Sequence, residues 1–161
     1  MNKKTILTIF FVAVSATSSF SQSENDCKSI GEEVFNAHSK ECLATMEAAA
    51  QKYSENGVAI IAFVPGEKTE SWSSRMLVVG TISNEKYNFL GVASAKAAEM
   101  AITLKDSGTG SNQPLIGELG YKGGVIKKVK CGYLIASFSG APSEIDAEIS
   151  KAGVDFLSKY Y

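Results

Sequence analysis

A short, uninterrupted apolar run from Val58 to Val64 constrains the fold more than any other feature of this sequence. Gly57 precedes the run and Pro65-Gly66 follows it, and the stretch between them is too short for a helix. An apolar run without polar alternation is typical of a strand that is covered on both faces. The sequence therefore predicts a sheet packed between helices, with this strand inside it.

Turn residues and hydrophobic repeats predict the other elements. Ser29 and Glu32 have the spacing of a capping box, and Pro65-Gly66-Glu67-Lys68 is typical of a hairpin turn. We expect a helix from about Ser29 to Asn56, a strand at 70–79, a helix at 88–105, strands at 124–126 and 133–138, and a helix from Pro142. Strands joined by hairpins between helices favour an antiparallel sheet and an α+β fold.

The first residues have the pattern of a signal peptide. Lys3-Lys4 precede an apolar stretch from Ile6 to Ala16, and small residues follow at Ser19 and Ser21. That stretch is shorter than the roughly 20 residues of a membrane-spanning helix. We therefore expect cleavage after residue 21, a single domain at 22–161 without a membrane anchor, and export to the periplasm or the medium.

The balance of charged residues argues against one class of partner, nucleic acid. The chain has 16 Lys and Arg against 17 Asp and Glu, so its formal net charge is −1. Nucleic-acid binding needs a basic excess or a basic patch, and the longest basic run outside the leader is Lys127-Lys128. Nucleic acid is therefore not an expected partner.

Three cysteines, Cys27, Cys42 and Cys131, lie in the part expected to be exported. An oxidising compartment favours one disulfide and one free thiol. The pairing of Cys27 with Cys42 is the first expectation, because Cys27 would lie in a leader able to fold back. Spacing alone does not fix this pairing.

Motifs along nearly the whole of the expected mature chain occur together, in the same order, in one known family. Gly123-Gly124 precedes a hairpin, the strand at 135–138 ends in Ser139-Gly140, and the last helix carries Glu144-Ile145-Asp146 and later Ala152-Gly153. Arg75-Met76 and Ala95-Lys96-Ala97 are further matches. With these motifs the chain resembles the GlcG/HbpS family, and the resemblance covers about residues 44–157.

This resemblance implies a profilin-like fold, an antiparallel sheet of about five strands between helices, in a homo-oligomer. It also implies non-covalent binding of haem or a related tetrapyrrole, in haem handling or redox sensing. The chain departs from the family at Phe63-Val64-Pro65, at Leu77-Val78 and at two positions usually held by glycine, Leu134 and Ser137. If those glycines make room for a ligand, the pocket of this chain is smaller or altered.

One helical stripe carries possible iron ligands. His38 is the only histidine, and Cys42 and Met46 follow at intervals of four residues. On a helix these side chains project from neighbouring turns, and imidazole, thiolate and thioether all ligate haem iron. We predict haem contacts at these three residues, with His38 as the metal ligand. The alternative is an ordinary core stripe.

Arg75 is the only arginine. Its planar guanidinium suits a carboxylate, so a haem propionate is the predicted partner, and an ion pair at the surface or a subunit interface is the alternative. A Ser or Cys nucleophile would depend on His38 as base, which argues against a hydrolase. Glu144, Asp146 and Glu148 favour a helix start, where acidic residues are expected, over a catalytic pair.

The predicted function is therefore binding of haem or a related tetrapyrrole after export. Two alternatives stay open: a haem-degrading enzyme or small-molecule oxidoreductase accessory, and a non-catalytic oligomeric module that kept the fold and lost the pocket. Leu134 and Ser137 are consistent with the last of these.

Overall fold

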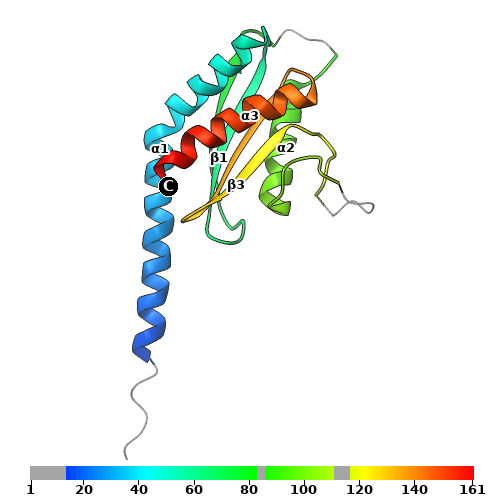
Figure 1. Cartoon of the computed structure of the whole chain (residues 1–161). Coiled ribbons are helices and arrows are strands. Elements are labelled where there is room, and N and C mark those ends of the chain that lie inside the picture. The colour runs from blue at the N-terminus through cyan, green and yellow to red at the C-terminus, as the bar shows by residue number, and fades with distance from the viewer. Residues whose placement is uncertain (1–13, 83–85, 111–116) are drawn as a thin grey trace, which may run out of the picture.

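The apolar run predicted as a buried strand lies at the centre of the fold. In the computed structural model, which describes residues 14–82, 86–110 and 117–161, strand β1 (Gly57–Pro65) is buried along its whole length. The other elements are α1 (Val14–Lys52), β2 (Ser73–Val79), α2 (Phe89–Thr103), β3 (Gly124–Val129), β4 (Gly132–Ser139), α3 (Ser143–Leu157) and the short 3₁₀ helix η1 (Ser158–Tyr160), as Figure 1 shows.

The strands form one antiparallel sheet in the order β2-β1-β4-β3. The α+β class and the antiparallel pairing predicted from the sequence are confirmed. About five strands were expected, whereas the described residues form a four-stranded sheet. β1 and β4 are the central strands, because each has a neighbour on both sides.

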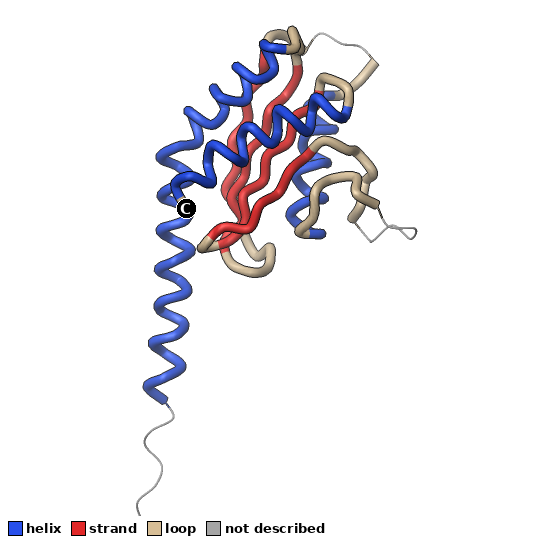
Figure 2. The backbone as a smooth tube through the Cα atoms, viewed as in Figure 1, coloured by secondary structure: helices blue, strands red, loops and turns tan. Residues whose placement is uncertain are grey.

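Alternate residues of β1 enter two separate cores. Ala59, Ile61 and Phe63 pack with α1 and α3, whereas Val58, Ile60 and Ala62 pack with α2. This alternation follows from the two-residue period of a strand. The result is three layers, with α1 and α3 on one face of the sheet and α2 on the other (Figure 2).

Helix α2 confirms the alanine-rich packing face predicted at 88–105. Ala93, Ala97 and Met100 are buried against the sheet. The helix begins after Asn88, whose side-chain oxygen accepts a hydrogen bond from the Gly91 amide, 2.8 Å away. Short side chains allow a close approach of helix and sheet, so α2 lies directly over β1 and β4.

Helix α1 differs from the prediction. It passes through Ser29 without interruption, so the Ser29–Glu32 spacing does not mark a helix start. No proline lies between residues 22 and 52, and helix-forming residues continue through this region. Figure 1 shows the first half of α1 extending beyond the sheet. Among the described residues no helix is both long and apolar enough to cross a membrane.

The predicted pairing of Cys27 with Cys42 is wrong. Cys27 is bonded to Cys131, with their Cα atoms 5.4 Å apart, and Cys42 is a buried free thiol. Cys27 and Cys42 lie on the same helix, and at 1.5 Å per residue their separation is about 22 Å, which no disulfide spans. The observed bond ties α1 to the turn between β3 and β4.

Candidate functional site

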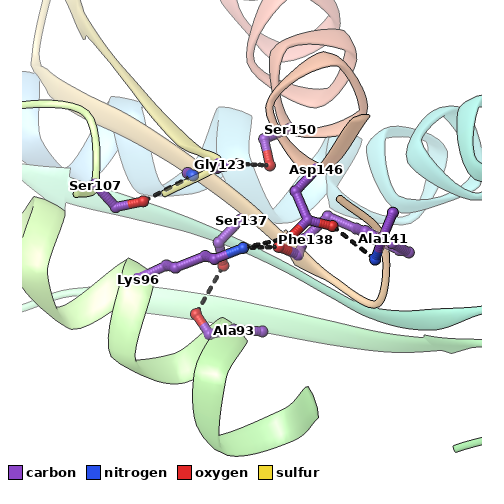
Figure 3. Close-up of polar contacts among 10 residues, drawn as sticks. Ala93, Lys96, Ser107, Gly123, Ser137, Phe138, Ala141, Asp146 and Ser150 are labelled. Atoms are coloured by element: carbon purple, nitrogen blue, oxygen red, sulfur yellow. Dashed lines mark hydrogen bonds and ion pairs between the residues drawn. The ribbon is translucent and has the colours of Figure 1, made fainter. Parts of the chain in front are cut away.

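A buried ion pair joins α2 to the start of α3. The Lys96 Nζ atom lies 2.6 Å from Asp146 Oδ2 and donates a second hydrogen bond to the Phe138 carbonyl oxygen, 2.7 Å away. Asp146 Oδ1 accepts a hydrogen bond from the Ala141 amide, 3.0 Å away (Figure 3). Only 2% of the Lys96 side chain and 5% of the Asp146 side chain are exposed. These contacts hold α2, the end of β4 and α3 together.

The electrostatics of the pair are dominated by burial. Burial raises the pKa of Asp146 above its ordinary value, and the hydrogen bond and charge of Lys96 oppose that rise. An ammonium group has three N–H donors, and the structure gives acceptors to two of those on Lys96. The third donor is left for another acceptor.

The double glycine lies directly against this pair. A Cβ atom at Gly123 would be 2.5 Å from Asp146 Cβ and 3.2 Å from Lys96 Nζ, and the residue has a φ of +109°. Its carbonyl oxygen accepts a hydrogen bond from Ser150 Oγ, 2.7 Å away. The next amide, that of Gly124, donates to Ser107 Oγ (Figure 3). Glycine at 123 therefore lets the chain close over the ion pair.

A cavity of about 490 Å³ opens beside the pair. Aromatic rings at Tyr87, Phe89 and Tyr121 line it, together with glycine, alanine and serine residues and Val92. The charges of Lys96 and Asp146 cancel, and Lys122, for which the described residues provide no ion-pair partner, adds a positive charge at the rim. Such a cavity suits an apolar ligand that carries an acidic group. Its lining residues are Tyr87, Phe89, Val92, Lys96, Gly120, Tyr121, Lys122, Ser139, Gly140, Ala141, Ser143 and Asp146.

The predicted ligand stripe is divided in the structure. Cys42 and Met46 are fully buried in the core between α1, α3 and the sheet, and the Cys42 thiol lies 3.3 Å from the Gly153 carbonyl oxygen. Burial raises the pKa of Cys42 to about 12. His38 is partly exposed, and its ring stacks on Tyr160 with the centroids 3.6 Å apart. The three side chains therefore do not face one common space.

A second cavity, of about 510 Å³, lies next to this stacked pair. Tyr160 and Tyr161 line it together with Ile30, Val34 and the Cys27–Cys131 disulfide. Asp26 and Lys130 are its charged residues. His38 does not line this cavity, whereas Tyr160, whose ring stacks on one face of the imidazole, does.

Arg75 lies on the edge strand β2 and is exposed. Its Nη2 atom donates to Asn36 Oδ1 on α1, at 3.4 Å. Neither cavity is lined by Arg75, His38, Cys42 or Met46. Among the described residues, no group of three or more His, Cys, Asp or Glu side chains could hold a metal ion.

The pairing of Lys96 with Asp146 was not among the predictions from the sequence. Asp146 was interpreted as an acidic residue at a helix start, and it does lie in the first turn of α3. A usable signal was present in α2, where Lys96 lies between Ala93 and Met100 at the spacing of one helix face. A lysine on a face that is otherwise apolar indicates a buried charge, and hence a buried acid opposite it.

Comparison of the chain with protein-family models, curated proteins and solved structures gives no match. The resemblance to the GlcG/HbpS family therefore stays a prediction that rests on the motifs quoted above.

Proposed function

We propose that this protein is exported and binds haem or a related tetrapyrrole in the cavity beside Lys96 and Asp146. The observation that carries the proposal is an aromatic-walled cavity with a buried ammonium group that has one donor left for a ligand. A flat macrocycle with acidic substituents matches both properties, because its faces are apolar and its edge is anionic. The family resemblance favours the same class of ligand.

The residues of the cavity fit such a ligand. Tyr87 and Tyr121 offer phenol oxygens, and tyrosine is one of the side chains that ligate haem iron in proteins. Lys96 and Lys122 offer donors to propionate groups. Haem would supply redox chemistry or binding of small molecules at iron, and the protein would hold and orient it. His38 remains the alternative ligand, from the second cavity.

Haemin titration of the purified mature protein tests this proposal. We expect a saturable shift of the Soret band, and about tenfold weaker binding for Lys122→Ala, because a hydrogen bond to a charged group is lost. Tyr121→Phe should alter the spectrum if its phenol ligates the iron. Lys52→Ala, an exposed lysine on α1, is the matched control.

The variants also distinguish the two cavities. Loss of binding in His38→Ala with normal binding in the Tyr121 and Lys122 variants would place the ligand beside Tyr160 instead. No saturable shift at micromolar wild-type protein would reject tetrapyrrole binding.

We also propose a profilin-like fold and a homo-oligomeric assembly. The antiparallel sheet between helices supports the first, although four strands were found where about five were expected. The second is supported by β2, an edge strand on which Met76 and Val78 are exposed. Open strand edges with apolar side chains are sites at which chains associate.

A further inference from the structure

Glu99 is a buried carboxylate that the proposed function leaves without a role. Its side chain lies on α2 and only 1% of the residue is exposed. No cation of the described residues pairs with it. Instead it accepts hydrogen bonds from three backbone amides, those of Gly108, Leu119 and Gly120. These donors compensate the cost of burying the charge.

The three amides belong to two segments of the connection between α2 and β3. Gly108 follows α2 in the chain, whereas Leu119 and Gly120 come shortly before β3. Leu119 N lies 2.7 Å and Gly120 N 3.2 Å from the same oxygen, Glu99 Oε2. One carboxylate therefore holds both segments against α2.

This contact lies next to the cavity. Gly120, Tyr121 and Lys122 form one of its walls, and Glu99 binds the first of these residues and the one before it. Lys96, on the floor of the same cavity, precedes Glu99 by three residues, so one turn of α2 carries both side chains. Toward β3, the next hydrogen bonds that hold this segment are at the Gly123 carbonyl oxygen, which accepts from Ser150 Oγ, and at the Gly124 amide, which donates to Ser107 Oγ.

We propose that Glu99 is a positioning residue for the ligand, because it fixes the backbone that carries Tyr121 and Lys122. This inference rests on the proposed function, since it assigns Glu99 a part in the affinity of that cavity. An amide has one acceptor oxygen, so its NH₂ group would face either the Gly108 amide or the Leu119 and Gly120 amides, and no hydrogen bond would form there. The hydrogen bonds that remain would also lose the strength that the negative charge of the carboxylate gives them. Glu99→Gln should therefore loosen the wall with almost no change in side-chain size.

The first measurement uses the ligand-free protein. Amide hydrogen exchange at Leu119 to Lys122 should become about tenfold faster in Glu99→Gln than in the wild type, because exchange reports local opening. Glu41→Gln, an exposed glutamate on α1, is the matched control and should leave these rates unchanged. Unchanged exchange in Glu99→Gln would overturn the inference whether or not haemin binds.

The second measurement is a double-mutant cycle with haemin as the probe. Glu99→Gln should weaken binding about tenfold in the wild-type background and have little effect when Tyr121 and Lys122 are both alanine, because coupled residues are not additive. A general loss of stability would weaken binding equally in both backgrounds and would overturn the inference. If the wild type binds no haemin, the proposed function fails, and hydrogen exchange decides the role of Glu99.

Discussion

Lys96 and Asp146 carry opposite charges and are both buried. Each charge offsets the cost of burying the other, so removal of either one leaves an unpaired buried charge. Their exposure differs from that of the pair Lys128 and Glu67, whose charged atoms lie 3.0 Å apart but whose side chains are more than half exposed. In water, the attraction of such an exposed pair is screened. The two pairs thus have similar distances between their charged atoms, but the buried pair is expected to matter far more for the free energy of unfolding.

This difference can be measured in single variants. Lys96→Met or Asp146→Asn should lower the free energy of unfolding by about 3–5 kcal/mol, because each leaves a buried charge without its partner. The double variant Lys96→Met, Asp146→Leu should lose much less than the sum of the two single losses. Lys128→Met is the control, and urea unfolding should show it close to wild type. Equal losses in all these variants would contradict the role assigned to the buried pair.

The Cys42 thiol should be inert in the folded protein. Its pKa is raised from 9.0 to about 12, so it stays protonated near pH 8.5, and it is fully buried. We expect iodoacetamide to label Cys42 only after unfolding in urea, with mass spectrometry as the readout. Rapid labelling of the native protein would contradict this.

The same shift makes stability depend on pH. Because the pKa is raised only in the folded state, the contribution of the protonated thiol is complete below pH 9 and is lost as the pH rises toward about 12.

For single residues, the sequence did not predict side-chain partners that are far apart in the chain. The helix-start interpretation of Asp146 was based on local sequence, and its partner lies 50 positions earlier in the chain. Periodicity identifies which face of a helix is apolar, and Lys96 lies on that face. It does not show which acid meets the lysine across the sheet.

Among the elements, α1 is held at two points of its first half by the other end of the chain. Cys27 is bonded to Cys131, and the Tyr161 hydroxyl donates to the Gly31 carbonyl oxygen, 2.6 Å away. The two contacts involve residues near the β3–β4 turn and after η1. They fix where α1 crosses the sheet.

Removal of the disulfide tests its contribution. The bond closes a loop with a sequence separation of 104 residues, so the variant Cys27→Ser, Cys131→Ser should lose about 2–5 kcal/mol in the free energy of unfolding. Non-reducing peptide mapping of the wild type should recover the Cys27 and Cys131 peptides joined. A Cys27–Cys42 peptide, or a double variant as stable as the wild type, would contradict the assigned bond.

Elements with strong local patterns were predictable. β1 has glycine and proline at its ends and no polar residue inside, and α2 has an alanine face, so both were placed within a few residues. The start of α1 was not placed correctly, because a capping-box spacing also occurs inside longer helices. The disulfide depends on how α1 crosses the sheet, which no local pattern specifies.

On the scale of the whole molecule, the two sides of the sheet are covered unequally. α2 packs on β1, β4 and β3, and the nearby side chains of Met76 and Val78 on β2 remain 49% and 37% exposed. Trp72, just before β2, is also exposed. This edge of the sheet is therefore the apolar surface where we place the proposed contact between copies.

Light scattering tests that surface. We expect the wild type to be larger than a monomer and the variant Met76→Lys, Val78→Lys to be a monomer, because lysine on an edge strand opposes pairing of strands. Lys127→Glu on β3, the other edge strand, is the control and should keep the assembly. A wild-type monomer at all concentrations, with and without haemin, would contradict the proposal.

The strand order has a consequence for the growing polypeptide. β1 is synthesised before the other strands, and β4 is one of its two hydrogen-bonded neighbours. β4 is the last strand of the sheet along the chain. A nascent chain that ends before Cys131 would expose one edge of its most apolar strand and would lack the cysteine that bonds to Cys27. Synthesis must therefore proceed through β4 before this protein can shield that segment from other chains.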